Sequence, residues 1–157
     1  MNKKLLILVL LLCIISCKST RNIHILDLGQ NKFISVEDST FKKLELWRKD
    51  SLACLKLRNS ELAYELSIEL NLKKSTKENI ISLLGQPFSF AHTKTLSVYD
   101  EEKDSNKLVD GEILQYIVDC ICLEGKYPNL KGSYILFEIF INKETGEVVN
   151  FGCFNAL

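Results

Sequence analysis

Four of the six cysteines of this 157-residue chain have the type and spacing that best suit chemistry: Cys54, Cys120, Cys122 and Cys153. An even number of cysteines in an exported chain indicates disulfides. Cys120 and Cys122 lie two positions apart in a predicted strand, so they share a face and cannot easily bridge each other. We therefore predict that Cys54 bridges to one of this pair and that Cys153 bridges to the other.

Two other uses of these thiols stay open. A Cys-x-Cys pair with two distant cysteines could hold zinc through four thiolates, although its tight spacing within a strand suits the loops of zinc sites poorly. A free cysteine could instead pair with His92, which is predicted in the loop after Pro87, as the nucleophile of a thiol hydrolase or oxidoreductase. Because disulfides would consume these thiols, we predict no metal, no cofactor and no catalytic residue.

A second group of residues combines an aromatic ring with opposite charges. Trp47, Asp50, Cys54 and Arg58 lie at i, i+3, i+7 and i+11, so they form one stripe if the segment is a continuous helix. Trp47, Asp50 and Arg58 could face a partner. We prefer the plainer interpretation that Trp47 is in the core, that Cys54 is buried or bridged, and that Asp50 and Arg58 brace the end of the helix.

Other motifs for catalysis or ion binding are weak. The sequence has no Gly-x-Ser-x-Gly elbow and no glycine-rich phosphate loop. Acidic residues crowd one predicted loop, but their spacing lacks the EF-hand pattern, and we interpret the loop as solvated. These residues are Asp100, Glu101, Glu102, Asp104 and Asp110.

Composition restricts the class of protein. Hydrophobic residues make up 46% of the chain and charged residues 25%, which is typical of a globular domain. Basic and acidic residues balance at 20 each, so no basic field exists to bind nucleic acid.

The first seventeen residues indicate export. Lys3 and Lys4 precede an apolar run of eleven residues, from Leu5 to Ile15, which is too short for the ~20 residues of a membrane-spanning helix. The run leads into Ile14-Ile15-Ser16-Cys17, which resembles the lipobox of bacterial lipoproteins. The resemblance implies that Cys17 is lipidated and becomes the mature N-terminus. An uncleaved helix, or an ordinary signal with an incidental cysteine, is the alternative.

The residues after Cys17 suggest where the anchored protein resides. Position 18 is Lys and no acidic run follows, so resemblance to known sorting rules implies the outer membrane, facing the periplasm. The predicted organisation is a lipoprotein signal peptide (1–16), a tether (17–32) and a single α+β domain (33–157).

Helices are predicted in the first half of this domain. A helix starts at Ser39 or Thr40 and carries an apolar stripe to Leu55. Residues 61–72 alternate like a strand, but their Leu, Glu and Ala content favours a helix. Ser75-Thr76-Lys77-Glu78 is a capping box that opens a third helix, with Ser75 as the cap, and Gly85 ends that helix before Pro87.

Strands are predicted in the second half: 96–99, 113–123, 134–141 and 147–154, with a short one near 33–36. Ile135, Phe137, Ile139 and Ile141 share one face and are the expected core of the sheet. The sequence thus predicts an α+β fold in which N-terminal helices pack on one face of an antiparallel meander of about four strands.

One family resemblance follows from this layout. The lipobox, the capping box and the stretch Leu83-Leu84-Gly85-Gln86-Pro87 resemble the small lipoproteins of the outer-membrane β-barrel assembly machinery and their β-lactamase-inhibitor-like relatives. The resemblance implies a non-catalytic binding or assembly module, held to the membrane by its N-terminal lipid and docked to an envelope protein. A thiol-dependent enzyme that uses His92 and a purely structural envelope lipoprotein are the alternatives.

Overall fold

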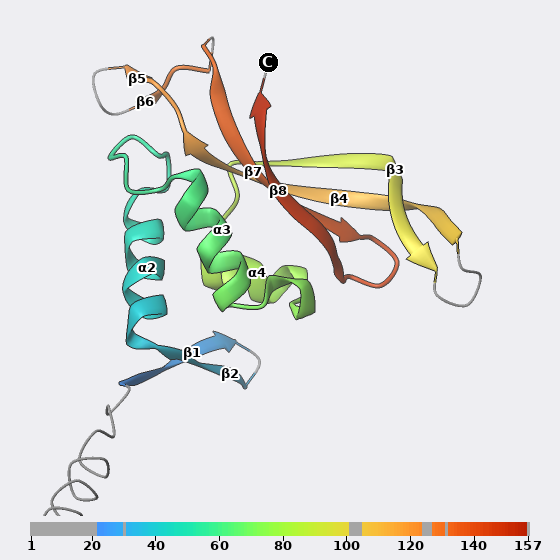
Figure 1. Cartoon of the computed structure of the whole chain (residues 1–157), viewed down its shortest axis with the longest axis horizontal. Helices are drawn as coiled ribbons and strands as arrows, with labels where there is room; N and C mark the ends of the chain where they lie inside the picture. The colour runs from blue at the N-terminus through green and yellow to red at the C-terminus, as the bar shows by residue number, and fades with distance from the viewer. Residues whose placement is uncertain (1–21, 30, 101–104, 124–126, 131, 157) are drawn as a thin grey trace, which may run out of the picture.

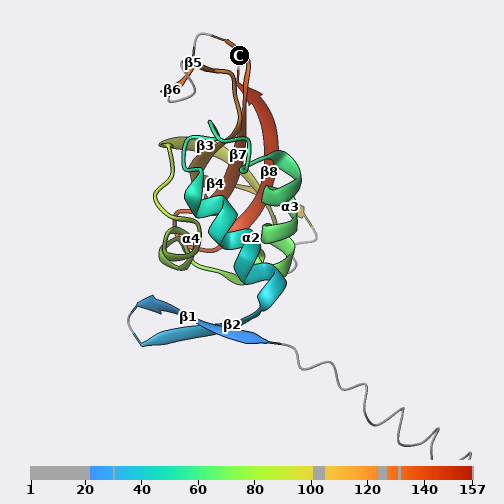
Figure 2. The ribbon, with the colours of Figure 1, turned by 90° about the vertical axis from the view of Figure 1, so that its left-hand side faces the viewer.

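Four antiparallel strands form the main sheet of the computed structural model, which describes residues 22–29, 31–100, 105–123, 127–130 and 132–156. Their order is β3-β4-β7-β8. The strands are β3 (Ser89–Asp100), β4 (Ser105–Asp119), β7 (Tyr134–Asn142) and β8 (Val148–Ala156). Helices α2 (Asp38–Lys49), α3 (Ser60–Glu69) and α4 (Lys77–Leu84) cover one face of the sheet (Figures 1 and 2). The predicted α+β architecture is confirmed.

The core lies between this sheet face and the helices. Strand alternation turns every second residue of β7 inward, so Phe137, Ile139 and Ile141 are buried as predicted, with Ile135 packed beside them. Trp47 of α2 is fully buried, and its indole Nε1 donates a hydrogen bond to the carbonyl oxygen of Leu84 at 3.0 Å. This bond ties α2 to the end of α4.

An additional hairpin precedes the helices. Strands β1 (Ile23–Gly29) and β2 (Lys32–Glu37) pair in antiparallel fashion, and Leu26 and Val36 turn inward to join the core. The strand predicted near residues 33–36 is confirmed, whereas the predicted tether does not extend through residues 23–29. The sequence pattern does not reveal strand β1, because its outward side chains include Ile23 and Ile25 and apolar residues therefore lie on both faces.

The helix boundaries differ from prediction in informative ways. Helix α2 begins at Asp38, before the predicted caps Ser39 and Thr40, and the Thr40 hydroxyl instead donates to Glu69 Oε2 at 2.8 Å. The helical prediction for residues 61–72 is confirmed by α3, followed by the 3-10 turn η1 (Leu72–Lys74). Asn59 caps α3, because its side-chain oxygen accepts from the Leu62 amide at 2.8 Å.

The cap of α4 lies one residue later than predicted. Thr76 Oγ1 accepts a hydrogen bond from the Asn79 amide at 3.4 Å, so Thr76 is the N-cap. Ser75 closes η1 instead, since its amide donates to the Leu72 carbonyl oxygen. Gly85 ends α4 as predicted, with a positive φ of 83° that glycine adopts without strain.

Two strand predictions are corrected. Strand β3 starts at Ser89, so His92 lies in a strand and not in a loop. Strand β4 ends at Asp119, and Cys122 belongs to the short strand β5 (Cys122–Leu123), which pairs with β6 (Tyr127–Pro128). Of the predicted acidic loop, Asp110 lies in β4, while residues 101–104 and the side chain of Asp100 lie outside the described residues.

Candidate functional site

The loop of residues 50–59, which joins α2 to α3, is organised by the carboxylate of Asp50. Asp50 Oδ1 accepts from the Leu55 amide at 3.0 Å, and Oδ2 accepts from the amides of Leu57 at 2.9 Å and Arg58 at 3.2 Å. Asp50 is only 3% exposed, so its charge is stabilised by these amides in place of water. The buried carboxylate therefore fixes the backbone conformation of the loop.

Arg58 holds the same loop from the other side. Its Nε and Nη2 both donate to the Trp47 carbonyl oxygen, and its Nη1 donates to the Ser51 carbonyl oxygen at 2.9 Å. Burial lowers the pKa of Arg58 to about 10, against the attraction of Asp50, so the guanidinium is charged at neutral pH. The interpretation that Asp50 and Arg58 brace the helix end is confirmed. Because these two side chains and Trp47 are buried, they do not form a partner-facing surface.

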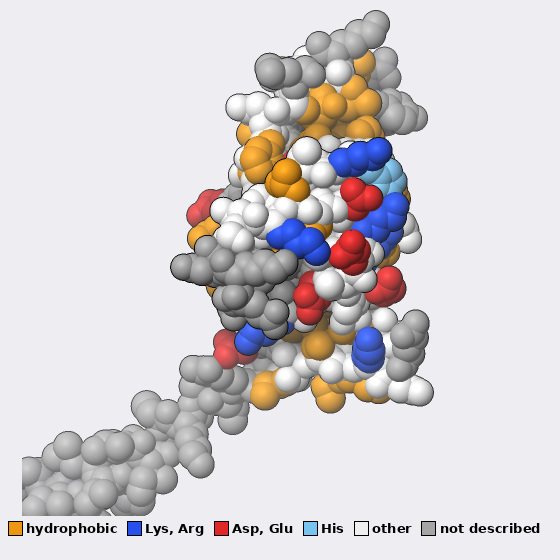
Figure 3. Space-filling view, turned by 90° about the vertical axis from the view of Figure 1, so that its right-hand side faces the viewer, with side chains coloured by type: hydrophobic (Ala, Val, Ile, Leu, Met, Phe, Trp, Pro, Cys, Tyr) orange, Lys and Arg blue, Asp and Glu red, His pale blue; other side chains and the backbone are white. Residues whose placement is uncertain are grey.

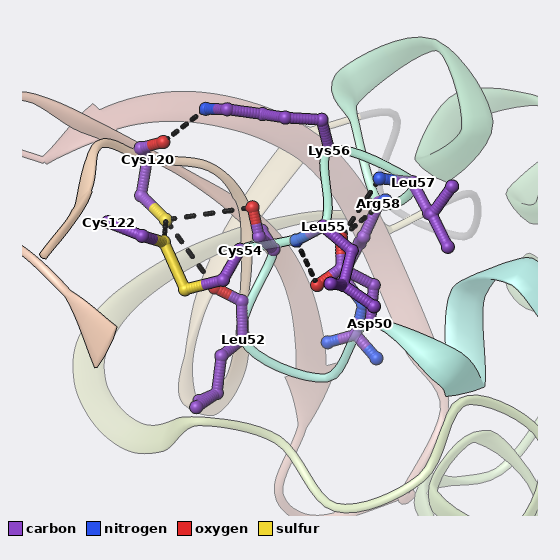
Figure 4. The surroundings of a disulfide bond; sticks show 10 residues. Asp50, Leu52, Cys54, Leu55, Lys56, Leu57, Arg58, Cys120 and Cys122 are labelled. Carbon is purple, nitrogen blue, oxygen red and sulfur yellow. Dashed lines mark hydrogen bonds between the residues drawn. A yellow bond between two sulfur atoms is a disulfide. The ribbon is translucent and has the colours of Figure 1, made fainter. Parts of the chain in front are cut away.

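The braced loop brings Cys54 to the end of the sheet. Cys54 and Cys122 form a disulfide, drawn in Figure 4, that joins positions 68 residues apart. The prediction that Cys54 bridges to one of the Cys120/Cys122 pair is confirmed, although Cys54 lies in a loop and not on a helix. On either side of it, Ala53 and Lys56 have positive φ angles of 56° and 61°, which side-chain-bearing residues adopt at a cost.

Cys120 lies against this disulfide without being part of it. Its Sγ is 3.2 Å from Cys122 Sγ and 3.4 Å from the Leu52 carbonyl oxygen, and the residue is buried (Figure 4). Burial raises the pKa of the Cys120 thiol, while the nearby Lys56 ammonium, which donates to the Cys120 carbonyl oxygen, acts in the opposite direction. The group is a protonated thiol at neutral pH.

The predicted second disulfide is wrong. Cys153 is a free, exposed cysteine on β8, opposite Phe137 of β7. The prediction assumed that the last strand lies next to residues 113–123, but β7 separates β8 from β4.

The four-thiolate zinc site, which was the alternative to disulfides, is not assembled either. Among the described residues, the sulfurs of Cys54, Cys120 and Cys122 all lie within 4.8 Å of one another, and Cys153 is not in this group. After reduction, the three thiolates could hold a soft cation such as Zn²⁺.

His92 is far from these cysteines. It lies in β3 opposite Glu112 of β4, whereas Cys120 follows the other end of β4 at Asp119. Seven residues of antiparallel strand at about 3.4 Å each put roughly 24 Å between the two positions. The free Cys153 lies on β8, at the opposite edge of the sheet from β3. The described residues therefore do not place a cysteine next to His92, as the alternative of a thiol enzyme requires.

A groove that the sequence did not reveal lies between α3 and β8. Tyr64 and Ile68 line its helix side one turn apart, and both are exposed; Asn150 and Phe151 of β8 line the other side. The groove holds about 460 Å³ and is flanked by Lys73. Strand β8 is the edge of its sheet. The only trace of the groove in the sequence is the i, i+4 spacing of Tyr64 and Ile68. This spacing places the two side chains on one helix face, but it does not show whether that face points to the core or to water.

A further apolar region lies at the end of the molecule opposite the β1–β2 hairpin. Figure 3 shows hydrophobic side chains gathered at that end, beyond a middle zone of charged side chains. The exposed apolar residues around the Cys54–Cys122 disulfide and the end of β8 are Leu55, Ile121, Leu123, Leu130 and Phe154.

Comparisons with known proteins give no relatives. The chain matches no protein-family model, no curated protein and no solved structure. The resemblance to the assembly-machinery lipoproteins therefore stays a prediction. In the described part of the chain, every helix is too short or too polar to cross a membrane.

Proposed function

We propose that this protein is a lipid-anchored, non-catalytic binding module of the bacterial cell envelope, which holds an extended segment of a partner protein in the groove between α3 and β8. The observation that carries the proposal is an edge strand lying beside an exposed apolar pair, Tyr64 and Ile68. An edge strand offers backbone donors and acceptors to an added strand, and pockets beside it select side chains.

The groove suggests the chemistry of the bound segment. Tyr64, Ile68 and Phe151 would pack against alternate apolar side chains of the partner, because successive side chains of a strand point to opposite faces. Lys73 would favour an acidic residue at one end. An extended segment with alternating apolar residues and an acidic residue is therefore the expected ligand.

The anchor rests on the N-terminal sequence. Asn2-Lys3-Lys4, the short apolar run and Ile14-Ile15-Ser16-Cys17 together support lipidation at Cys17, and Lys18 supports the outer membrane facing the periplasm. The disulfide between Cys54 and Cys122 suits an oxidising compartment. Replacing Cys17 with Ala should remove labelling by a lipid precursor and release the protein from the membrane fraction; unchanged labelling would refute the anchor alone.

Site-specific photo-crosslinking in intact cells tests the groove. A photoreactive phenylalanine analogue at position 64 or 68 should trap one discrete partner, and the matched control at Leu46, an exposed apolar residue of α2 outside the groove, should not. Adding Ile68→Lys should abolish the crosslink from position 64. Equal products at all three positions, or none at 64 and 68, would refute the groove and favour a purely structural lipoprotein.

A further inference from the structure

We propose that Cys54, Cys120 and Cys122 form an internal thiol–disulfide exchange site, in which Cys120 displaces Cys54 from its disulfide with Cys122. The proposal is independent of the anchor and of the groove. It rests on the contact between a free thiol and a disulfide: Cys120 Sγ lies 3.2 Å from Cys122 Sγ. All three sulfurs lie within 4.8 Å of one another. A Cys120–Cys122 bridge is disfavoured within one regular strand, but β4 ends at Asp119 and residues 120 and 121 lie outside the strands, so that geometry does not apply here.

The exchange balances without an added oxidant or reductant. Solvent removes the proton of the Cys120 thiol, and the thiolate attacks Cys122 Sγ. A bond forms between the sulfurs of Cys120 and Cys122 while the bond between Cys54 and Cys122 breaks. The electron pair of the broken bond leaves on Cys54 Sγ, which takes up a proton from solvent. One disulfide and one thiol are present before and after the step.

The surroundings of Cys120 disfavour its thiolate and therefore slow the exchange. The thiol lies against the Leu52 carbonyl oxygen, and burial, together with the charges of Asp50 and Asp119, opposes formation of the thiolate. The Lys56 ammonium, which is bound to the Cys120 carbonyl oxygen, is the charge that favours the thiolate. Because only the thiolate attacks, exchange should be slow near neutral pH and should accelerate as the pH rises.

Exchange would change how the loop is held. In the resting form, the disulfide ties residue 54 to residue 122; in the exchanged form, it joins only Cys120 and Cys122, and the loop loses its covalent link. Ala53 and Lys56, on either side of Cys54, both have positive φ angles, which are unfavourable for residues with side chains. Release of the loop would allow these two residues to return to ordinary backbone conformations. The Cys54 thiol would then be free to react.

Alkylation of the full chain carrying Cys153→Ser, which removes the exposed thiol of β8, tests the proposal. The oxidised protein is incubated with N-ethylmaleimide at about pH 7 and about pH 9, digested with trypsin without reduction and mapped by mass spectrometry. Trypsin places Cys54 in the peptide 50–56 and the other two cysteines in 108–126, so the two disulfide isomers differ in mass and connectivity.

We expect the alkylated peptide 50–56 to accumulate together with an internally bridged peptide 108–126. The rate should rise about tenfold per pH unit below the thiol pKa, because the thiolate fraction rises tenfold. The control Cys120→Ser should leave Cys54 unalkylated over the same period. Alkylation of Cys120 alone, or equal alkylation of Cys54 in the Cys120→Ser variant, would overturn the proposal.

A second variant covers the case in which Cys120→Ser fails to fold. Cys54→Ser removes the disulfide to Cys122 and leaves Cys120 and Cys122 as two neighbouring free thiols. Mild oxidation with diamide should convert them to the internally bridged peptide 108–126. Two free thiols after oxidation, in a variant whose circular dichroism matches that of the parent, would also overturn the proposal.

Discussion

The guanidinium of Arg58 lies 4.2 Å from the centre of the Trp47 ring and also donates two hydrogen bonds, of 3.2 and 2.9 Å, to the Trp47 carbonyl oxygen. One side chain thus covers the face of the buried indole and satisfies a carbonyl in the last turn of α2. The positive charge at this helix end also suits the helix dipole.

Arg58→Lys should lower the free energy of unfolding by about 2–3 kcal/mol, because lysine offers neither the planar fork nor the stacked surface. Urea denaturation followed by Trp47 fluorescence measures the change. Arg48→Lys is the matched control: Arg48 binds two backbone carbonyls of α4 nearer the surface. The Arg48→Lys variant should lose about 1 kcal/mol or less of its free energy of unfolding. Equal losses would mean that the stacking on Trp47 contributes nothing.

Thr76→Ala should destabilise the protein by about 0.5–2 kcal/mol through loss of the cap on α4. Ser75→Ala should change the unfolding midpoint within experimental error, because the Ser75 hydroxyl is not the cap. Thermal denaturation of both variants decides between the two positions. A larger loss of stability in Ser75→Ala than in Thr76→Ala would mean that Ser75 is the cap, as the sequence predicts.

Cys54→Ser should lower stability by about 2–5 kcal/mol, since the disulfide closes a long loop in the unfolded chain. Cys153→Ser, at an exposed free cysteine, should be close to neutral. Denaturation of both variants under non-reducing conditions gives the comparison. If a reducing agent destabilises the Cys54→Ser variant as much as it destabilises the parent, a disulfide other than Cys54–Cys122 carries the effect.

Glu69 should make the contact between α2 and α3 sensitive to acid. Partial burial favours its neutral form, but hydrogen bonds from Lys43 and Thr40 outweigh this and hold the pKa of Glu69 below its ordinary value of 4.5. Since the unfolded chain binds the proton more readily, this stabilisation is complete above the ordinary value and disappears as the pH falls through the lowered one.

The stability gap between the parent and Glu69→Gln should accordingly be widest above about pH 5 and should close near about pH 3. Urea midpoints across this range measure it. Glu61→Gln, at an exposed residue of the same helix, is the control for the exchange of one carboxylate for an amide. A gap that stays constant with pH would mean that Glu69 acts through packing and not through its charge.

Local patterns predicted most of the fold. The alternation of apolar residues in β7 and the glycine turn at Gly146 identified the central strand and its hairpin, because these signals act within a few residues. Helix α2 ends at Lys49, before the predicted stripe to Leu55 is complete. Arg58 reaches back to the Trp47 carbonyl oxygen at this end, a contact that helical periodicity does not encode.

The candidate sites were predicted only in part. Cys54 was correctly expected to bridge to the Cys120/Cys122 pair, but the role of Cys153 depended on strand order, which pairing across the sheet sets and local pattern does not. The groove was missed for the same reason: its two walls come from α3 and β8, which meet only in the folded chain.

The distance along the chain between those two walls determines when the groove can first exist. Strand β8 follows every helix and strand it packs against, and synthesis proceeds from the N-terminus. A nascent chain therefore carries Tyr64 and Ile68 on a helix with no facing wall until residues 148–156 have been made. The partner capture proposed above would consequently require β8, and a chain that lacks residues 148–156 would display Tyr64 and Ile68 with no facing wall.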